Sequence, residues 1–181
     1  MIFKKEFYFI RHGLTDYNVS DVKIDHEDVS LNAMGLLQVH AIEPIMAKLP
    51  IKSVCHSPLK RAKETKEVIS SRLLASHYEM SSLGECSLRV WQDMTLCGPD
   101  AYYSGQAHVR DFMHRVLNGL NEALTLEGPV LIVAHGGLHW ATCCLMGIVE
   151  HEWVIGNSIP VHFFPTRLVD GWLENSYEMS I

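Results

Sequence analysis

The stretch Val130-Leu-Ile-Val-Ala-His-Gly-Gly137 opens with five apolar residues and closes with a histidine and two glycines. An uninterrupted apolar run of this length is typical of a strand buried on both faces of a sheet. The change at His135-Gly136 predicts a turn into a helix. Strands that lead into helices in this way are typical of α/β layers built on a parallel sheet. We therefore expect His135 at the end of a central strand.

Apolar runs elsewhere in the chain predict further strands. They lie at 7–10, 53–56, 161–164 and 172–177, and one more is expected after His77. Asp170-Gly171 suits a hairpin turn between the last two of these strands. Helical patterns separate the earlier strands. The sequence therefore predicts a three-layer α/β/α fold with a central, mostly parallel sheet.

Three segments carry apolar residues at helical spacing. Asn32 suits the N-cap of the first, whose apolar residues are Met34, Leu37, Ala41, Ile45 and Leu49. Because Pro44 falls inside this pattern, we expect a kink or a break there. Ser57-Pro58 suits an N-cap followed by proline at the first position of the second helix. The third helix is expected over 109–123.

Length and composition favour one globular domain. The chain has 181 residues, of which 48% are apolar and 20% charged, so we expect a single domain over 1–181. The weakly patterned stretch 86–106 is expected to form a short cap insertion. A net charge of −6 without a basic run argues against nucleic acid as a partner.

The apolar stretches are of strand length, so no membrane span is expected. The first residues, Met1-Ile-Phe-Lys-Lys-Glu6, lack the apolar segment of a signal peptide. We expect a cytoplasmic protein, and the sequence specifies no oligomeric state.

Cysteines and histidines raise the question of metal or redox chemistry. The five cysteines form no CxxC pair, which favours reduced thiols; a redox switch at Cys143-Cys144 is the alternative. His135 and His139 are four residues apart, as in some zinc sites. The glycine pair between them belongs to a turn, and no HExxH motif or cysteine cluster supplies further ligands. We therefore expect no metal and no cofactor, with His139 in the core or beside the pocket.

Three strand ends should deliver polar side chains to one edge of the sheet, where α/β folds collect their ligands. The set consists of Arg11, His12, Ser57, Arg61, His135 and Gly136. Guanidinium groups bind phosphate oxygens in parallel pairs, and helix starts near Ser57 and Gly136 add backbone N–H groups. A neutral imidazole in such a pocket can attack phosphorus while the arginines stabilise the transferring charge.

Two further features of this chemistry are expected. Glycines after His12 and His135 would let the backbone approach the ligand closely. The leaving alkoxide needs a proton from a carboxylic acid on the opposite side. The residue pattern alone does not identify that acid.

Four segments, in order, carry recurrent motifs. They are Arg11-His-Gly-Leu-Thr-Asp-Tyr-Asn18, Leu31-Asn-Ala-Met-Gly-Leu-Leu-Gln38, Ser57-Pro-Leu-Lys-Arg-Ala-Lys-Glu-Thr65 and Val133-Ala-His-Gly-Gly137. They resemble the RHGxTxxN, LTxxGxxQ, SPLxRAxxT and VxHGG segments of the histidine phosphatase superfamily, in its phosphoglycerate mutase-like branch. Asn stands in place of Thr in the second. Four motifs in the family's order are a specific signal.

The resemblance implies a metal-independent phosphomonoester hydrolase that forms a phosphohistidine on His12. It implies that the phosphoryl group of a small phosphorylated substrate is held by Arg11, Arg61, His135 and Gly136, with Asn18 contributing to phosphate binding. The family's proton donor is a Glu in a segment that Leu83-Gly-Glu85 matches, with Trp91 at the expected spacing. We therefore expect Glu85 to be the acid, and Glu79 and Asp93 are alternatives.

Two other functions stay open. A cofactor-dependent phosphoglycerate mutase would share this core, but mutases of the family carry a longer insertion after the acid. Here a short stretch separates Glu85 from the next helix, so water should reach the site and hydrolysis is favoured. A catalytically weak phospho-ligand or protein-binding module is the second alternative, because Arg89 and Gln92-Asp93 depart from the family pattern.

Substrate specificity is expected to lie in the loop 14–30 and in the cap. Candidate residues to contact the group beyond the phosphate are Lys23, Arg89 and Tyr102.

Overall fold

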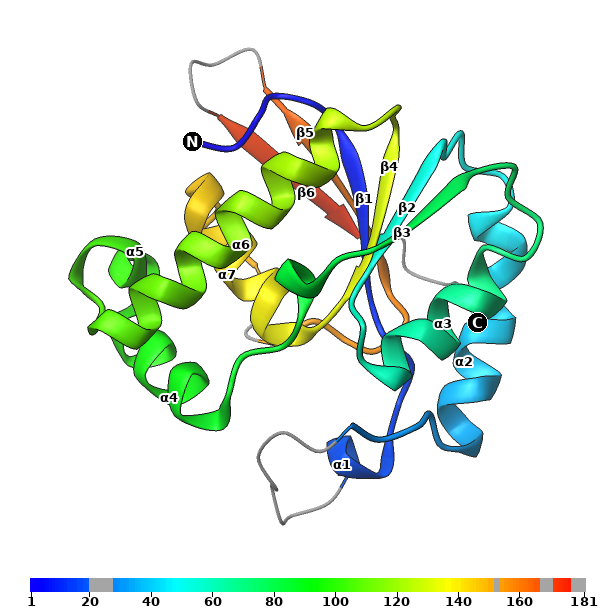
Figure 1. Ribbon diagram of the computed structural model, residues 1–181, viewed down its shortest axis with the longest axis horizontal. Coiled ribbons are helices and arrows are strands. Elements are labelled where there is room, and N and C mark those ends of the chain that lie inside the picture. The colour runs from blue at the N-terminus through cyan, green and yellow to red at the C-terminus, as the bar shows by residue number, and fades with distance from the viewer. Residues whose placement is uncertain (20–27, 152–153, 167–170, 177–181) are drawn as a thin grey trace.

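A computed structural model of the chain describes residues 1–19, 28–151, 154–166 and 171–176. Its centre is a mixed six-stranded sheet in the order β3-β2-β4-β1-β5-β6 (Figure 1). The strands are β1 (Phe7–Arg11), β2 (Ser53–His56), β3 (Ser76–Glu79), β4 (Val130–Ala134), β5 (Pro160–Pro165) and β6 (Trp172–Ser176).

The first four strands of the sheet order run parallel, as the sequence predicts. β4 is flanked by β2 and β1, and Phe7 pairs with Val130 in register. β5 lies antiparallel to β1, and β6 lies antiparallel to β5. The predicted strand pair at the end of the chain is thus confirmed. Asp170 of the expected hairpin turn lies outside the described residues.

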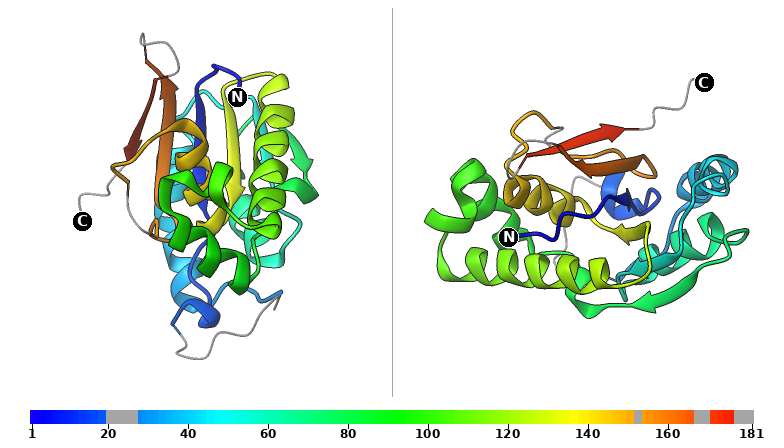
Figure 2. Two further views of the ribbon diagram at one scale, coloured as in Figure 1. Left: turned by 90° about the vertical axis from the view of Figure 1, so that its left-hand side faces the viewer. Right: turned by 90° about the horizontal axis from the view of Figure 1, so that it is seen from above.

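Helices cover both faces of the sheet, which confirms the three-layer prediction (Figure 2). They are α1 (Asp16–Val19), α2 (Ala33–Met46), α3 (Lys60–Ile69), α4 (Leu88–Cys97), α5 (Ala101–Ser104), α6 (Ala107–Thr125) and α7 (Gly136–Met146), with 3₁₀ turns η1 (Ser81–Leu83) and η2 (Gly98–Asp100). Helices α2 and α3 lie on one face, and α6 and α7 lie on the other. Among the described helices, none is both long and apolar enough to cross a lipid bilayer.

Side-chain alternation along β1 divides the core into two clusters. Phe7 and Phe9 belong to the cluster under α6 and α7. Tyr8 and Ile10 belong to the cluster under α2 and α3. A strand with both faces covered must be apolar at every position, which accounts for the uninterrupted apolar pattern of β1 and β4.

The first predicted helix forms. Asn32 is its N-cap, and its side chain accepts a hydrogen bond from the backbone N–H of Gly35. Helix α2 does not break at Pro44 and ends two residues later, at Met46. A proline in the last turn removes only one of the helix's final hydrogen bonds, so the helix tolerates it.

Only part of the apolar row that indicated this helix faces the core, where Ile45 and Leu49 pack against buried residues. Met34 and Leu37 are 55% and 64% exposed, whereas the buried face consists of Gly35, Val39, Ile42 and Met46. The helix carries apolar residues on both sides, so periodicity identified a helix without identifying its inner face.

Ser57 is not the N-cap of the second helix. Helix α3 begins at Lys60 and its N-cap is Leu59, which has no capping side chain. The predicted proline position is therefore also wrong. Ser57 instead lies in the short turn after β2, and its hydroxyl is directed to the site described below.

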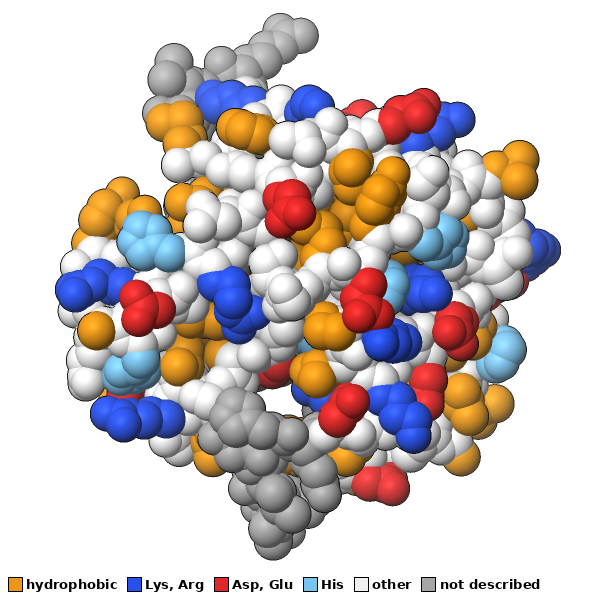
Figure 3. Space-filling model, in the orientation of Figure 1, with side chains coloured by type: hydrophobic (Ala, Val, Ile, Leu, Met, Phe, Trp, Pro, Cys, Tyr) orange, Lys and Arg blue, Asp and Glu red, His pale blue; other side chains and the backbone are white. Residues whose placement is uncertain are grey.

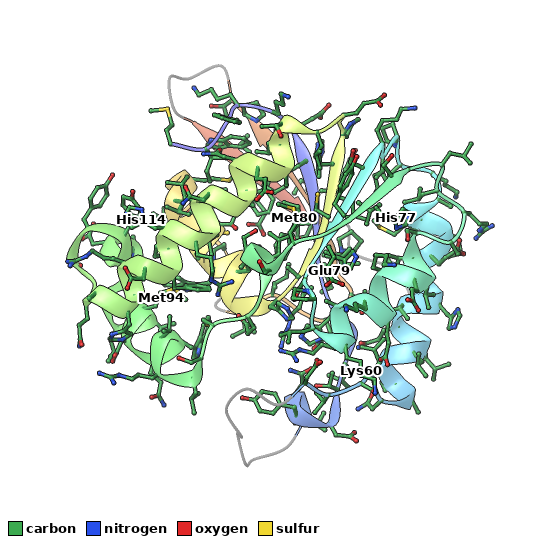
Figure 4. The ribbon with its side chains drawn as sticks, viewed as in Figure 1. Lys60, His77, Glu79, Met80, Met94 and His114 are labelled. Atoms are coloured by element: carbon green, nitrogen blue, oxygen red, sulfur yellow. The ribbon has the colours of Figure 1, made fainter. Side chains whose placement is uncertain are left out.

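The stretch between β3 and α6 is short-helical, as expected, and consists of η1, α4, η2 and α5. Met94 of α4 is fully buried, whereas His114 of α6 is exposed (Figure 4). On the face seen in Figure 3, basic and acidic side chains are interspersed.

The assignment of the buried face of α2 can be tested with one pair of variants. Ile42→Ala removes methyl groups from the core and should lower the free energy of unfolding by about 2–5 kcal/mol. Leu37→Ala, on the exposed face, should change it by no more than about 0.5 kcal/mol. Urea unfolding followed by circular dichroism measures both. Equal losses would contradict the assigned face.

Candidate active site

A pocket of about 380 Å³ opens at the carboxyl edge of the parallel strands. Its lining includes Arg11, Tyr17, Asn18, Glu85, Trp91, Gly136 and Asn157. Arg11 ends β1 and Gly136 begins α7. The structure thus brings together the strand ends that the sequence predicted to converge.

His12 lies next to this pocket and is almost completely buried, with 3% of its surface exposed. Its Nδ1 is 2.7 Å from the carbonyl oxygen of Gly13. A carbonyl only accepts hydrogen bonds, so Nδ1 carries the ring proton and Nε2 carries the lone pair. The Nε–H of Arg61 donates to that Nε2 over 3.2 Å.

The surroundings keep His12 neutral. Burial lowers the pKa of His12 well below its ordinary value of 6.5, and the charges of Arg61 and Arg11 lower it further. Burial favours the uncharged imidazole, and two nearby cations disfavour a third. The ring is therefore an unprotonated base in a cationic pocket.

His135 is fully buried, and its ring centroid lies 5.2 Å from that of His12. Its Nε2 is 2.7 Å from the hydroxyl oxygen of Ser57. Burial, His12, Arg61 and Arg11 together lower the pKa of His135 well below 6.5. The hydroxyl that was expected to cap a helix thus orients this imidazole.

The Arg11 guanidinium is held by the backbone, and both guanidinium groups lie near the carboxylate of Glu85. A terminal N–H of Arg11 donates to the carbonyl oxygen of Ile155 over 2.7 Å. Burial lowers the pKa of both Arg11 and Arg61, and the carboxylate of Glu85 opposes this for both. The buried Nε of Arg11 and Nδ1 of His135 have no hydrogen-bond partner among the described residues.

Glu85 brings a carboxylate to the pocket wall. Its Oε1 accepts from the backbone N–H of Cys86 at 2.9 Å, and its Oε2 lies 3.3 Å from the N–H of Gly137. Arg115 of α6 donates to the carbonyl oxygens of Ser82 and Gly84 and so holds the segment that carries Glu85. No sequence motif pointed to Arg115.

The alternative acids lie elsewhere. Glu79, at the end of β3, forms an exposed ion pair with Lys63 at 2.8 Å (Figure 4). Asp93 of α4 is 2.7 Å from His108 Nε2. Neither side chain lines the pocket.

Asn18 and Asn157 brace the loop after β1. The Oδ1 of Asn18 accepts from the backbone N–H and the hydroxyl of Thr15, at 3.1 and 2.9 Å. The side-chain amide of Asn157 donates to the carbonyl oxygen of His12 at 2.8 Å. Asn157 belongs to no motif that the sequence indicated.

Two of the motif glycines permit close packing within the protein. A Cβ on Gly13 would lie 2.8 Å from the carbonyl oxygen of Gly35 in α2. A Cβ on Gly137 would lie 2.5 Å from the Glu85 carboxylate. Both distances are shorter than real Cβ contacts, so a side chain at position 13 would clash with backbone, and one at position 137 would displace the carboxylate of Glu85.

None of the three residues predicted to contact the group beyond the phosphate is found in the catalytic pocket among the described residues. Lys23 lies outside the described residues. Arg89 is exposed on α4 and lies 3.8 Å from Asp93, and Tyr102 lines a different pocket. Within the described part of the loop 14–30, Leu14, Tyr17 and Asn18 reach the catalytic pocket.

Comparisons with known proteins agree with this geometry. The sequence model of the histidine phosphatase superfamily (branch 1) matches residues 7–155. An uncharacterized phosphatase of Bacillus subtilis, PhoE, is 31% identical over 135 residues, which cover 70% of this chain and 69% of that protein.

A second relative and a solved structure are both named glucosyl-3-phosphoglycerate phosphatase. The glucosyl-3-phosphoglycerate phosphatase of Mycolicibacterium vanbaalenii is 28% identical over 172 residues, covering 81% of this chain and 76% of that protein. The solved structure of a mycobacterial glucosyl-3-phosphoglycerate phosphatase with VO3 superimposes with a TM-score of 0.73 and 24% identity, covering 97% of this chain and 99% of that one. The structural likeness supports the fold, and the named relatives support a general phosphatase function. The chain belongs to the histidine phosphatase superfamily (branch 1).

Proposed function

We propose that this protein is a phosphomonoester hydrolase that works without a catalytic metal, through a phosphohistidine on His12. The observation that carries this proposal is the setting of His12: a buried, neutral imidazole whose Nε2 lone pair points to Arg61. An imidazole in that form is a nucleophile, and the guanidinium beside it is suited to bind the group under attack.

Buried donors next to His12 support a phosphate as the ligand. Arg11 Nε and His135 Nδ1 are buried donor atoms without a partner among the described residues. Buried polar atoms are rarely left unsatisfied, and the oxygens of a phosphoryl group would satisfy them. Asn18 has its Oδ1 engaged, so its amide N–H₂ is the group that would donate to a phosphate oxygen. The N–H groups at the start of α7, from Gly136 on, add to the same electrostatic field.

In the first chemical step, His12 Nε2 forms a bond to phosphorus as the ester P–O bond breaks. Protonated Glu85 gives its proton to the leaving oxygen, so the alcohol departs neutral. In the second step, Glu85 takes a proton from a water molecule that attacks phosphorus. The P–N bond then breaks and inorganic phosphate leaves. Arg11, Arg61 and His135 stabilise the charge on the equatorial oxygens in both steps.

The pocket suits a small substrate. About 380 Å³ beside the phosphate site accommodates an alcohol portion of modest size, and Leu14, Trp91 and Val154 supply apolar wall. The named relatives include an enzyme for glucosyl-3-phosphoglycerate, which is a small phosphate monoester. We propose a substrate of this chemical class, and we propose α4, η2 and α5 as the cap over it.

Replacement of the nucleophile tests the proposal. Wild-type protein should hydrolyse p-nitrophenyl phosphate in EDTA, and His12→Ala should lower kcat by at least about three orders of magnitude. His114→Ala, an exposed histidine on α6, is the control and should retain full activity. The release of p-nitrophenolate measures all three.

The other outcomes have distinct meanings. A folded wild type that binds inorganic phosphate in calorimetry but turns nothing over would identify a binding module. Phosphate exchange between positions of a sugar acid, dependent on a bisphosphate primer, would identify a mutase. Loss of turnover in EDTA while circular dichroism shows a folded chain, with rescue by zinc, would overturn the metal-free mechanism.

The role of Glu85 can be tested with leaving groups of different basicity. Glu85→Gln should reduce turnover of an alkyl phosphate by roughly 10²–10⁴-fold. With p-nitrophenyl phosphate the loss should be much smaller, because that leaving group needs little protonation. Glu79→Gln and Asp93→Asn serve as matched controls and should leave the ratio of the two rates unchanged. A uniform loss on both substrates in Glu85→Gln would exclude it as the donor.

The protonation state of His12 determines the acid limb of the pH profile. Because the pKa of His12 lies well below 6.5, the free imidazole persists as pH falls past that value. The activity that depends on it should fall only when pH approaches the lowered pKa. We expect kcat/KM for p-nitrophenyl phosphate, which reports the free enzyme, to keep its dependence on neutral His12 at pH 5.5 to 6.5. A fall centred near pH 6.5 would show that the folded protein does not lower this pKa.

A further inference from the structure

A second group of metal-binding side chains lies apart from the catalytic pocket. His139 and Cys143 are one turn apart on α7, Glu174 lies on β6, and His151 follows α7. The ligand atoms of His139, Cys143 and His151 all lie within 4.8 Å of one another. None of the four residues lines the catalytic pocket.

Three distances define the group. His139 Nε2 is 3.3 Å from Glu174 Oε2, and Cys143 Sγ is 3.2 Å from the same oxygen. Cys143 Sγ is 3.7 Å from His139 Nε2. The nitrogen of His139 and the sulfur of Cys143, both on α7, therefore form a compact triangle with the carboxylate oxygen of Glu174 on β6.

These lengths match the edges of a zinc tetrahedron. With Zn–N and Zn–O bonds of about 2.0–2.1 Å and a Zn–S bond of about 2.3 Å, tetrahedral ligands stand roughly 3.3–3.6 Å apart. The three measured edges fall close to that range. The ligand atom of His151 lies within 4.8 Å of those of His139 and Cys143, so a movement of this side chain toward the triangle would supply the fourth ligand.

We propose that His139, Cys143, His151 and Glu174 form a structural site for one Zn²⁺ ion. Two imidazoles, a thiolate and a carboxylate are a donor set that zinc prefers. On binding, Cys143 releases its thiol proton to solvent and Glu174 stays ionised. The two negative charges balance the charge of the ion. Four protein ligands leave no open position for substrate, so the site is structural and not catalytic.

The burial of the proposed ligands supports a zinc site. His139 is 1% exposed, and its ring packs against Phe9 and Phe163 in the core. The carboxylate of Glu174 is 11% exposed. Surrounding side chains thus hold these ligands in place. His151 is half-buried, which gives the ion a path from solvent.

The site would link three parts of the fold. It would join α7 to the edge strand β6 and fix His151, which precedes the segment at 154–158. In that segment, the carbonyl of Ile155 accepts from Arg11 and the amide of Asn157 donates to the carbonyl of His12. Zinc would therefore stabilise the fold next to the pocket without contact with the reacting atoms.

The experiment uses the full chain without an affinity tag, and zinc as the probe. Metal content after zinc incubation and desalting should be one ion per chain by elemental analysis. Cobalt substitution should produce the near-ultraviolet thiolate-to-cobalt charge-transfer band and the visible bands of tetrahedral Co²⁺. Zinc should also raise Tm by several degrees, and chelation should reverse this rise.

Two adjacent cysteines provide a matched pair of variants. Cys143→Ser should lose the charge-transfer band and bind zinc at least ten-fold more weakly. Cys144→Ser should behave as wild type, because Cys144 lines a different pocket with Ile2 and Trp172. Glu174→Gln, which keeps its size, should weaken zinc binding without removing the thiolate band.

The proposal fails if wild-type protein shows no thiolate-to-cobalt band, a result that does not depend on any variant folding. It also fails if Cys143→Ser binds zinc as tightly as wild type, which would place the ion on other histidines. Both results are independent of phosphatase activity, so they leave the proposed hydrolysis untouched.

Discussion

Two guanidinium groups and two imidazoles share one buried space, and the rest of the site is arranged around that constraint. Burial lowers the pKa of both Arg11 and Arg61, and the charge of Arg61 lowers the pKa of Arg11 further. Two cations close together in a buried space are unfavourable. Glu85 offsets part of this charge, and the remainder attracts an anion. The positive field that makes the apo site costly is the same field that would bind and activate a phosphoryl group.

Much of each sequence motif serves to hold His12 in position. Thr65 of the third segment accepts a hydrogen bond from the N–H of Gly13. Gln38 of the second accepts from the N–H of Leu14. These bonds fix the loop after β1 from two helices, and Asn157 fixes it from the other side. Preorganised side chains do not have to be ordered during the reaction, which is why a site of this kind depends on partners that never touch substrate.

The sequence was most informative where the chemistry follows from strand ends. The burial of β1 and β4 on both faces made them recognisable, and the polar residues directly after them had to meet at one edge. How side chains pack against one another was harder to predict from the sequence. The apolar spacing indicated helix α2 but not its inner face, because the helix is apolar on two sides. The prediction that Ser57 caps a helix was wrong, because its hydroxyl contacts His135 instead of the start of α3. Arg115 and Glu174 act through tertiary contacts that no local pattern reveals.

The start of α7 separates a histidine of the catalytic site, His135, from a histidine of the proposed zinc site, His139. His135 and His139 are four residues apart, yet His135 is the N-cap of α7 with extended backbone, and His139 lies within the helix. The cap position turns His135 toward Ser57 and His12, whereas the helical position turns His139 toward Cys143 and Glu174. The sequence argument against a metal considered His139 together with His135, whereas the structure places Cys143, one turn further along α7, beside His139. Because the backbone of His135 is extended and that of His139 is helical, the two side chains do not share a helix face although they are four residues apart.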